Sequence, residues 1–306
     1  MPDRSKASSA AHDKAVPGHR FSWLGRVIAS GQSWFAPREV VRVPTTSRPG
    51  EVGAEQVQRL AADPTPAQPK VIVVDSHFPV PPFLRASSAL APGVALLARL
   101  ASNRVLDAAP RPPTGKPGRP RKHGAKLALR QPGPPDRQET ARRFGQDVRI
   151  SAWVSYHFRA VPNLVGLVVR VEFLRADGSP RYKRPLWLFW SGPSAIARAA
   201  LVRMDLLRFT IEHFFRFLSQ RLGLLAAHRG DLGPIETWVA VVVLADWQLL
   251  LARDWACSGP APSTCSNRVP RHGSYPPITP TRSRYTPEYA FGSLPIGQCH
   301  DRVETT

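Results

Sequence analysis

The sequence predicts an α/β protein built on a mixed β-sheet, and three observations lead to this fold class. Candidate strands and helices alternate along the 306 residues in the order strand, strand, helix, strand, helix, β-rich segment, helix. The run "VIVV" before Asp75 is continuously apolar, which suits a strand covered by helices on both faces. Apolar side chains recur at helical spacing in residues 206–224, so this segment is expected to be a helix packed on the core.

The first part of the chain supplies a hairpin, a helix and a strand. Residues 20–44 contain two β-rich runs around "SGQS", which predicts a β-hairpin. The segment "AEQVQRLAAD" (residues 54–63) is predicted to be a short helix, and "VIVV" is the strand that follows it. Residues 82–101 are then expected to be helical, with a break in the middle.

The second part begins with a change of composition. Residues 108–143 are rich in Pro, Gly, Arg and Lys, whereas residues 148–190 contain three candidate strands, the last two separated by the turn sequence "ADGSPRY". Residues 194–223 and 235–254 are predicted to be helical. The element order therefore ends with helices that follow a β-rich region.

The charge of the chain favours a polyanionic partner. Lys and Arg number 42 against 22 Asp and Glu, which gives a formal net charge of +20. An excess of this kind is typical of proteins that contact DNA, RNA or an anionic membrane face. Proline is also frequent, at 33 residues, so linkers or tails are expected. Residues 1–17 and 256–306 are predicted to be disordered because they are polar or Pro-rich and lack periodicity.

The cysteines and apolar segments favour a cytoplasmic protein without a membrane partner. The three cysteines (Cys257, Cys265 and Cys299) match neither a metal knuckle nor a disulfide framework, which favours a reducing compartment. The polar N-terminus has no apolar stretch of the signal-peptide type. The longest apolar run, residues 238–251, is short for a membrane span and contains Asp246, so we expect a buried helix.

Two carboxylates are candidates for chemistry. Asp75 ends its strand at the carboxyl edge, where open α/β sheets place their sites, but it could equally cap the next turn. Glu212 lies between Arg208 and Arg216 at spacings of four residues, beside the apolar stripe of its helix. The alternative for Glu212 is a surface salt-bridge ladder, worth about 0.2–0.5 kcal/mol per pair.

A basic segment is a candidate for nucleic-acid binding. In "GKPGRPRKHG" (residues 115–124), an extended Gly-Arg-Pro core around Arg119 has the form of a minor-groove hook. Its basic neighbours would contact phosphates; they are Lys116, Arg121, Lys122 and Lys126. The alternative is a solvated, Pro-rich basic loop.

Several segments together resemble a known family. These are "VIVVDSHF", "LLARLASNRVL", "GKPGRPRKHG", "YKRPLWLFWSGP", "RFTIEHFFRFLSQRLGL" and "ETWVAVVVLADWQLLLARDWA". Their order, over residues 15–255, resembles that of bacterial insertion-sequence transposases of the DDE superfamily, the type with a β-rich insertion. The resemblance implies a ribonuclease H-like mixed sheet flanked by helices, with the insertion between the second catalytic Asp and the Glu.

The family activity gives roles to individual residues. In the family, an Asp-Asp-Glu triad binds two divalent metal ions, usually Mg²⁺, for DNA strand cleavage and transfer. By resemblance Asp75 is the second Asp, Glu212 is the Glu, and Arg208 contacts DNA phosphate. Arg216 and Arg221 are further DNA-binding candidates. The implied partners are transposon ends and target DNA, and a homodimer is left open.

The chain departs from the family pattern at three places. The Tyr expected before Arg208 is Asp205, and the Lys expected after Glu212 is Ser219, which Arg221 would replace only in part. A first, central strand ending in Asp should precede the hairpin, but Asp13 has no such strand. Relative to the family, the chain therefore looks truncated at its N-terminus, with the site incomplete.

The resemblance divides the chain into five parts: a disordered start (1–17), the first part of the catalytic domain (18–107), a basic linker and β-rich insertion (108–193), a helical part with the Glu (194–255), and a disordered Pro-rich tail (256–306). We expect a DDE-type transposase or its remnant, with activity largely lost. The alternative function is non-catalytic DNA binding by a basic protein derived from a mobile element.

Overall fold

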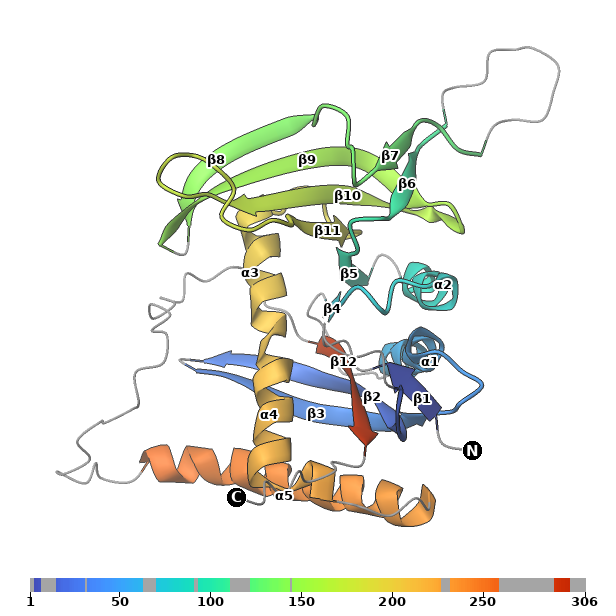
Figure 1. The fold of residues 1–306 in the computed structure, drawn as a ribbon, viewed down its shortest axis with the longest axis vertical. Coiled ribbons are helices and arrows are strands. Elements are labelled where there is room, and N and C mark those ends of the chain that lie inside the picture. The colour runs from blue at the N-terminus through green and yellow to red at the C-terminus, as the bar shows by residue number, and fades with distance from the viewer. Residues whose placement is uncertain are drawn as a thin grey trace, which may run out of the picture.

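The fold is known from a computed structural model, which describes residues 3–6, 15–30, 32–62, 70–90, 93–110, 122–143, 145–226, 232–258 and 289–297. Within these residues, twelve strands form one mixed sheet that helices flank (Figure 1). The α/β class with a mixed, helix-flanked sheet, predicted from the sequence, is confirmed.

The elements follow one another as the sequence pattern indicated, with some additions. The first half of the chain contains β1 (Asp3–Lys6), β2 (Ala15–Ser30), β3 (Gln32–Val43), α1 (Pro49–Ala61), β4 (Lys70–Val74), α2 (Pro81–Ala89) and β5 (Val94–Leu100). The second half contains β6 (Val105–Ala108), β7 (Lys126–Ala128), β8 (Arg137–Arg143), β9 (Gln146–Phe158), β10 (Val161–Phe173), β11 (Leu186–Trp190), α3 (Arg198–Arg208), α4 (Thr210–Arg221), the 3₁₀-helix η1 (Leu224–Ala226), α5 (Leu232–Ser258) and β12 (Tyr289–Gly297).

Five strands form the centre of the sheet in the spatial order β3, β2, β12, β4, β5. The β2–β3 pair is the predicted hairpin, and it is antiparallel. The C-terminal strand β12 lies between β2 and β4, antiparallel to β2 and parallel to β4 (Figure 1). Strands β4 and β5 are parallel to each other. The last strand of the chain therefore joins the N-terminal hairpin to the rest of the sheet.

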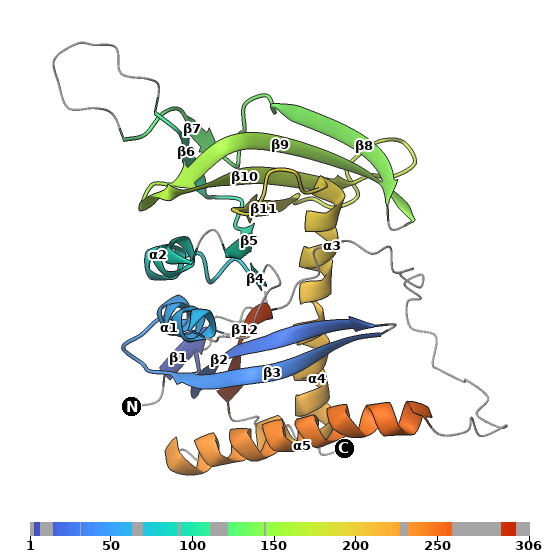
Figure 2. The same ribbon diagram turned by 180° about the vertical axis from the view of Figure 1, so that it is seen from behind.

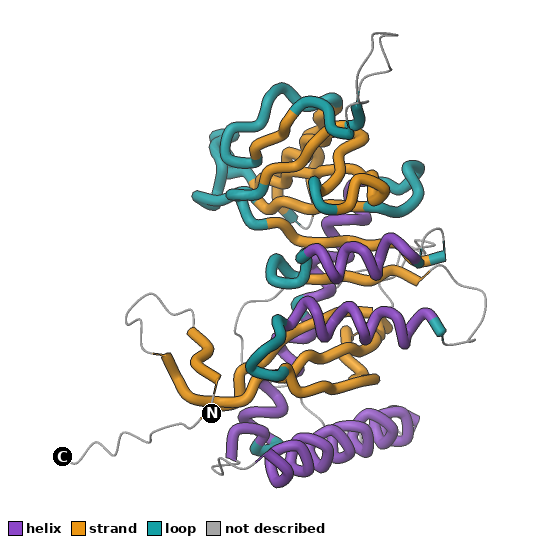
Figure 3. Tube along the Cα trace, turned by 90° about the vertical axis from the view of Figure 1, so that its right-hand side faces the viewer, coloured by secondary structure: helices purple, strands orange, loops and turns teal. Residues whose placement is uncertain are grey.

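Strand β4 is buried on both faces, as its apolar run predicted. Ile72 and Val74 belong to a core cluster with residues of α1 and α2, whereas Val71 and Val73 belong to a cluster with residues of α3. Figure 3 shows α1 and α2 together over one face of the sheet, and Figure 1 shows α3 and α4 as one column along the other. Prolines in the first turns of α1 and α2 suit the starts of both helices.

Strands β6–β11 form a second region, here called the β-rich segment. Strand β11 pairs antiparallel with β5, and β10 pairs antiparallel with β11 and β9. The predicted turn between β10 and β11 is present: Oδ1 of Asp177 accepts a hydrogen bond from the backbone N–H of Ser179 at 2.9 Å. The three strands expected in residues 148–190 are thus confirmed as β9, β10 and β11.

The predicted helical segment 82–101 is wrong in its second half. Residues 81–89 are helical, but "VALLARL" (94–100) is the strand β5, which lies between β4 and β11. A short apolar run cannot be assigned to helix or strand by periodicity alone, and pairing on both sides decides it here. The predicted helix 194–223 is also divided, because α3 ends at Arg208 and α4 begins at Thr210.

Both ends of the chain contain strands where we expected disorder. Asp3–Lys6 and residues 15–17 belong to β1 and β2, which pair with each other. Within the predicted tail, α5 extends to Ser258, and Tyr289–Gly297 is β12. The remaining residues of the two predicted tails lie outside the described parts of the chain.

The helix α5 lies beneath β3 and the end of α4 (Figure 2). Its inner face contributes Ile235, Val239 and Val242 to the core, but its outer face leaves leucines such as Leu244 and Leu251 exposed. The expectation of a fully buried helix is therefore wrong. Residues Leu232–Arg253 are long and apolar enough to cross a membrane. One such helix is weak evidence, because core helices of soluble proteins pass the same test; the fold does not indicate a membrane protein.

Asp246 makes the stability of α5 dependent on pH. Burial raises its pKa to about 6, and its Oδ2 has no hydrogen-bond partner among the described residues. A carboxyl with a raised pKa in the folded state lowers stability as pH rises from about 4 to about 6, and the loss persists above that range.

Replacing Asp246 should relieve this destabilisation. We expect Asp246→Asn to raise the melting temperature at pH 8 and to raise it less at pH 4, where the wild-type carboxyl is also protonated. Thermal unfolding followed by circular dichroism at the two pH values measures this difference. A lower melting temperature of the variant at pH 8 would contradict it.

Candidate functional site at the end of strand β4

Asp75 begins the turn that follows β4. Its Oδ1 accepts a hydrogen bond from the backbone N–H of His77 at 2.6 Å, and Nδ1 of the His77 ring lies 3.1 Å from the same oxygen. This Asp therefore caps its own turn, which was the alternative reading from the sequence. Its side chain is only partly buried, so the carboxylate remains near the surface.

The surroundings keep Asp75 ionised. Burial acts to raise the pKa of Asp75, but the hydrogen bonds from His77, together with the positive charges of His77 and Arg208, outweigh it and lower the pKa. In the same pair, the hydrogen bond to Asp75 raises the pKa of His77. Asp75 at neutral pH is thus an anion within electrostatic reach of Arg208.

Arg208, at the end of α3, forms an ion pair with one of the two predicted catalytic carboxylates. Its Nη2 lies 3.6 Å from Oε1 of Glu212 on α4, and its guanidinium stacks on the Phe209 ring at 4.8 Å. The charge of Arg208 also contributes, as the smallest of the causes, to the lowered pKa of Asp75. The side chain of Arg208 is only 4% exposed, so in this arrangement it is not presented to a DNA phosphate.

Asp205 is a member of this network that sequence reasoning noted only as a departure from the family. Its side chain is 0% exposed, and its Oδ2 accepts a hydrogen bond from Nη2 of Arg99 on β5 at 2.9 Å. Its Oδ1 lies 3.8 Å from Nε of Arg208 and has no hydrogen-bond partner among the described residues. The signal available in the sequence was Arg99, because a charged residue within the otherwise apolar run of β5 indicates an ion pair with a buried partner.

These residues do not fit a two-metal Mg²⁺ site. The cation of Arg208 lies 3.8 Å from Asp205 and 3.6 Å from Glu212, so both carboxylates already have a basic partner. Asp205 is enclosed and already paired with Arg99. The strand beside β4, "YAFGSLPIG", contains no carboxylate that could complete the set. The arrangement is therefore a charge network that links β5, α3 and α4.

The predicted DNA-binding residues are distributed over two separate regions. Arg216 and Arg221 are exposed on α4, and Lys122 and Lys126 are exposed at the start of β7. Figure 1 places α4 and β7 far apart, so these pairs do not form one patch. The other three candidates of the basic segment lie outside the described residues; they are Lys116, Arg119 and Arg121.

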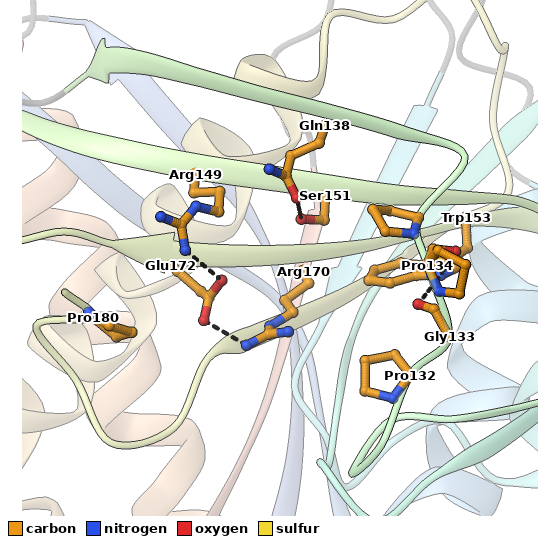
Figure 4. A pocket seen from close by; sticks show the side chains of 11 residues that line it. Pro132, Gly133, Pro134, Gln138, Arg149, Ser151, Trp153, Arg170, Glu172 and Pro180 are labelled. Carbon is orange, nitrogen blue, oxygen red and sulfur yellow. Dashed lines mark hydrogen bonds and ion pairs between the residues drawn. The ribbon is translucent and has the colours of Figure 1, made fainter. Parts of the chain in front are cut away.

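A shallow cleft of about 520 Å³ opens on the β-rich segment (Figure 4). Its two arginines share one carboxylate, because Glu172 lies 2.5 Å from Nη2 of Arg170 and 3.9 Å from Nη1 of Arg149. One rim is formed by prolines and by Trp153, whose indole N–H donates to the carbonyl of Pro134 at 3.0 Å. The two guanidinium groups and one carboxylate leave the cleft positively charged, and none of the predicted site residues lines it.

A second group of potential metal ligands lies in the β-rich segment. Asp107, His123 and His157 place one ligand atom each within 4.8 Å of the others. Sequence reasoning missed this group because its members come from three separate segments.

No protein-family model matches the chain, and no curated protein matches it. Conclusions about function therefore depend on the residues and the fold.

Proposed function

We propose that the chain is a DDE-type transposase, or the remnant of one, that binds DNA and has lost most or all of its strand-cleavage activity. The observation that supports this best is the position of Asp75 and of the Arg208–Glu212 ion pair relative to the sheet. Asp75 follows the central parallel strand β4, whereas Arg208 and Glu212 lie on α3 and α4, the helices that cover the sheet.

The order of the strands also supports a ribonuclease H-like arrangement. The hairpin β2–β3 comes first, and the parallel strands β4 and β5 follow with helix α2 between them. The helices α3 and α4 come later in the chain, in the order that a ribonuclease H-like fold would have. Strand β12 lies between the hairpin and β4, which is the place the resemblance gives to a central strand carrying the first Asp. The β-rich segment lies between Asp75 and Glu212 in sequence, as the insertion would.

Loss of cleavage follows from the chemistry of the cluster. A triad that acts as a unit fails when one member is absent, and here Glu212 is paired with Arg208. The runner-up function, non-catalytic DNA binding by a basic protein, needs only the net charge of +20 and the exposed basic residues. Among the described residues, the pairing of Glu212 with Arg208 supports this second function over an active enzyme.

The test is DNA binding and DNA nicking by the full chain. We expect the affinity for a labelled DNA duplex, measured by fluorescence anisotropy, to fall steeply with salt. The logarithm of the binding constant should fall by about 0.9 per log unit of salt concentration for each phosphate contact. The double variants Lys122→Ala/Lys126→Ala and Arg216→Ala/Arg221→Ala should each lower this slope by about 1–2. Supercoiled plasmid should remain intact with Mg²⁺.

A control variant that loses the same charge distinguishes direct contact with phosphate from the effect of net charge on DNA binding. Lys183→Ala/Arg184→Ala removes two exposed cations from the β10–β11 connection and should change the slope less. Affinity that is flat between low and high salt would rule out DNA binding of this type. Mg²⁺-dependent nicking that disappears in Asp75→Ala would show that the cluster is a working active site.

A further inference from the structure

We propose that Asp107, His123 and His157 bind one divalent transition-metal ion. Asp107 lies on β6, His157 lies on β9, and His123 precedes β7. This site is remote in sequence from Asp75 and Glu212, and it does not depend on the proposed function.

The backbone brings the three residues together. Asp107 and His157 are directly paired in the antiparallel β6–β9 ladder. The segment with His123 is held beside them because the N–H of Gly124 donates to the carbonyl of Ala108 at 2.9 Å. Each ligand is therefore positioned by hydrogen-bonded main chain, which is the kind of support that a metal site requires.

The separation of the two imidazole nitrogens suits ligands of a single ion. Nδ1 of His123 lies 3.0 Å from Nε2 of His157, and the atoms of all three ligands lie within 4.8 Å of one another. Two imidazole nitrogens bound at 2.0–2.1 Å are about 2.9 Å apart at a right angle and about 3.3 Å apart in a tetrahedron. The observed separation falls between these two values.

Burial also favours a ligand at this place. His157 is 1% exposed and Asp107 is 3% exposed, so both polar side chains have given up contact with water. Nε2 of His157 makes the 3.0 Å contact with His123, and its Nδ1 is buried without a hydrogen-bond partner among the described residues. A cation offsets the cost of enclosing two imidazoles beside a carboxylate.

The ligand types select the class of metal. Two imidazoles and one carboxylate suit Zn²⁺, Co²⁺, Mn²⁺ or Fe²⁺, whereas Mg²⁺ prefers oxygen ligands. Three protein ligands leave a coordination position for water. Since His123 belongs to the basic segment "GKPGRPRKHG", an ion here would attach the end of that segment to β6 and β9. The structural consequence is a metal-dependent anchor for the segment.

The test uses Zn²⁺ and Co²⁺ with the chelator-treated full chain. We expect one equivalent of Zn²⁺ per chain in competition with a chromophoric chelator, and visible d–d absorption when Co²⁺ is added. His123→Ala and Asp107→Asn should each weaken Zn²⁺ binding at least tenfold. The double variant His77→Ala/His213→Ala, whose histidines are exposed and lie outside the cluster, should bind like the parent.

Thiolates are the competing explanation for zinc binding. The experiment is therefore done in a background with Cys257→Ser, Cys265→Ser and Cys299→Ser, in which binding should persist. Circular dichroism checks that the variants fold, and Asp107→Asn provides a nearly isosteric change at one ligand. Absence of stoichiometric binding, loss of binding in the cysteine-free background, or equal Zn²⁺ affinity in folded ligand variants would overturn the proposal.

Discussion

Removing β12 is expected to abolish the single cooperative unfolding transition of the chain. Along its whole length, Tyr289–Gly297 pairs with β2, and Tyr289 and Ala290 also pair with β4. Without this strand, the hairpin and the parallel strands lose their shared partner, and both expose unpaired edges. The two halves of the central sheet would then be connected mainly through the helices.

Two truncated chains make this measurement specific. A chain that ends at Ser258 should unfold broadly or aggregate on heating, whereas a chain that ends at Gly297 should keep the transition of the full protein. A synthetic peptide of residues 286–300 should restore part of the transition when added to the shorter chain, by strand addition. Identical melting curves for the two truncations would show that β12 does not contribute to the stability of the sheet.

Removing Asp205 is expected to have the largest effect of any change in the charge network. Asp205→Ala leaves Arg99 without its carboxylate and deprives the buried Arg208 of one of its two acidic partners. Breaking a buried ion pair from one side costs about 3–5 kcal/mol in the free energy of unfolding. Because Arg208 retains Glu212 and Arg99 is partly exposed, we expect a value near the lower end of that range.

Urea unfolding followed by circular dichroism measures this loss. The matched control is Glu212→Gln, in which the altered side chain is 54% exposed and pairs with the same arginine. Exposed pairs contribute little, so the control should change the free energy of unfolding by less than about 1 kcal/mol. Equal losses in the two variants would contradict a special role for the buried Asp205.

The parts of the fold that could be predicted are those with a strong local signal. The run before Asp75 was recognisable as a strand because it is apolar on both faces, and the hairpin because two β-rich runs flank a turn. The segment 94–100 was misassigned because its leucines suit a helix equally well until pairing with β4 and β11 decides. Strand β12 gave no signal, since "YAFGSLPIG" contains glycine and proline.

In the candidate site too, only the residues related by a local sequence pattern could be predicted. Strand position indicated Asp75, and helical spacing indicated the pairing of Arg208 with Glu212. The partner of Asp205 is Arg99, 106 residues earlier, and no local pattern relates the two. For the same reason the three potential metal ligands, gathered by β-sheet pairing, could not be predicted from their spacing.

The position of β12 has a consequence for the way the protein is made. Gly18 pairs with Gly297, so the hairpin is synthesised long before the strand that completes its pairing. Contacts that are so distant along the chain slow folding, because a long loop must close before they stabilise anything. The core of the sheet can be completed only after Tyr289–Gly297 has left the ribosome. Until then the edge of β2 would remain available to chaperones or to a neighbouring nascent chain.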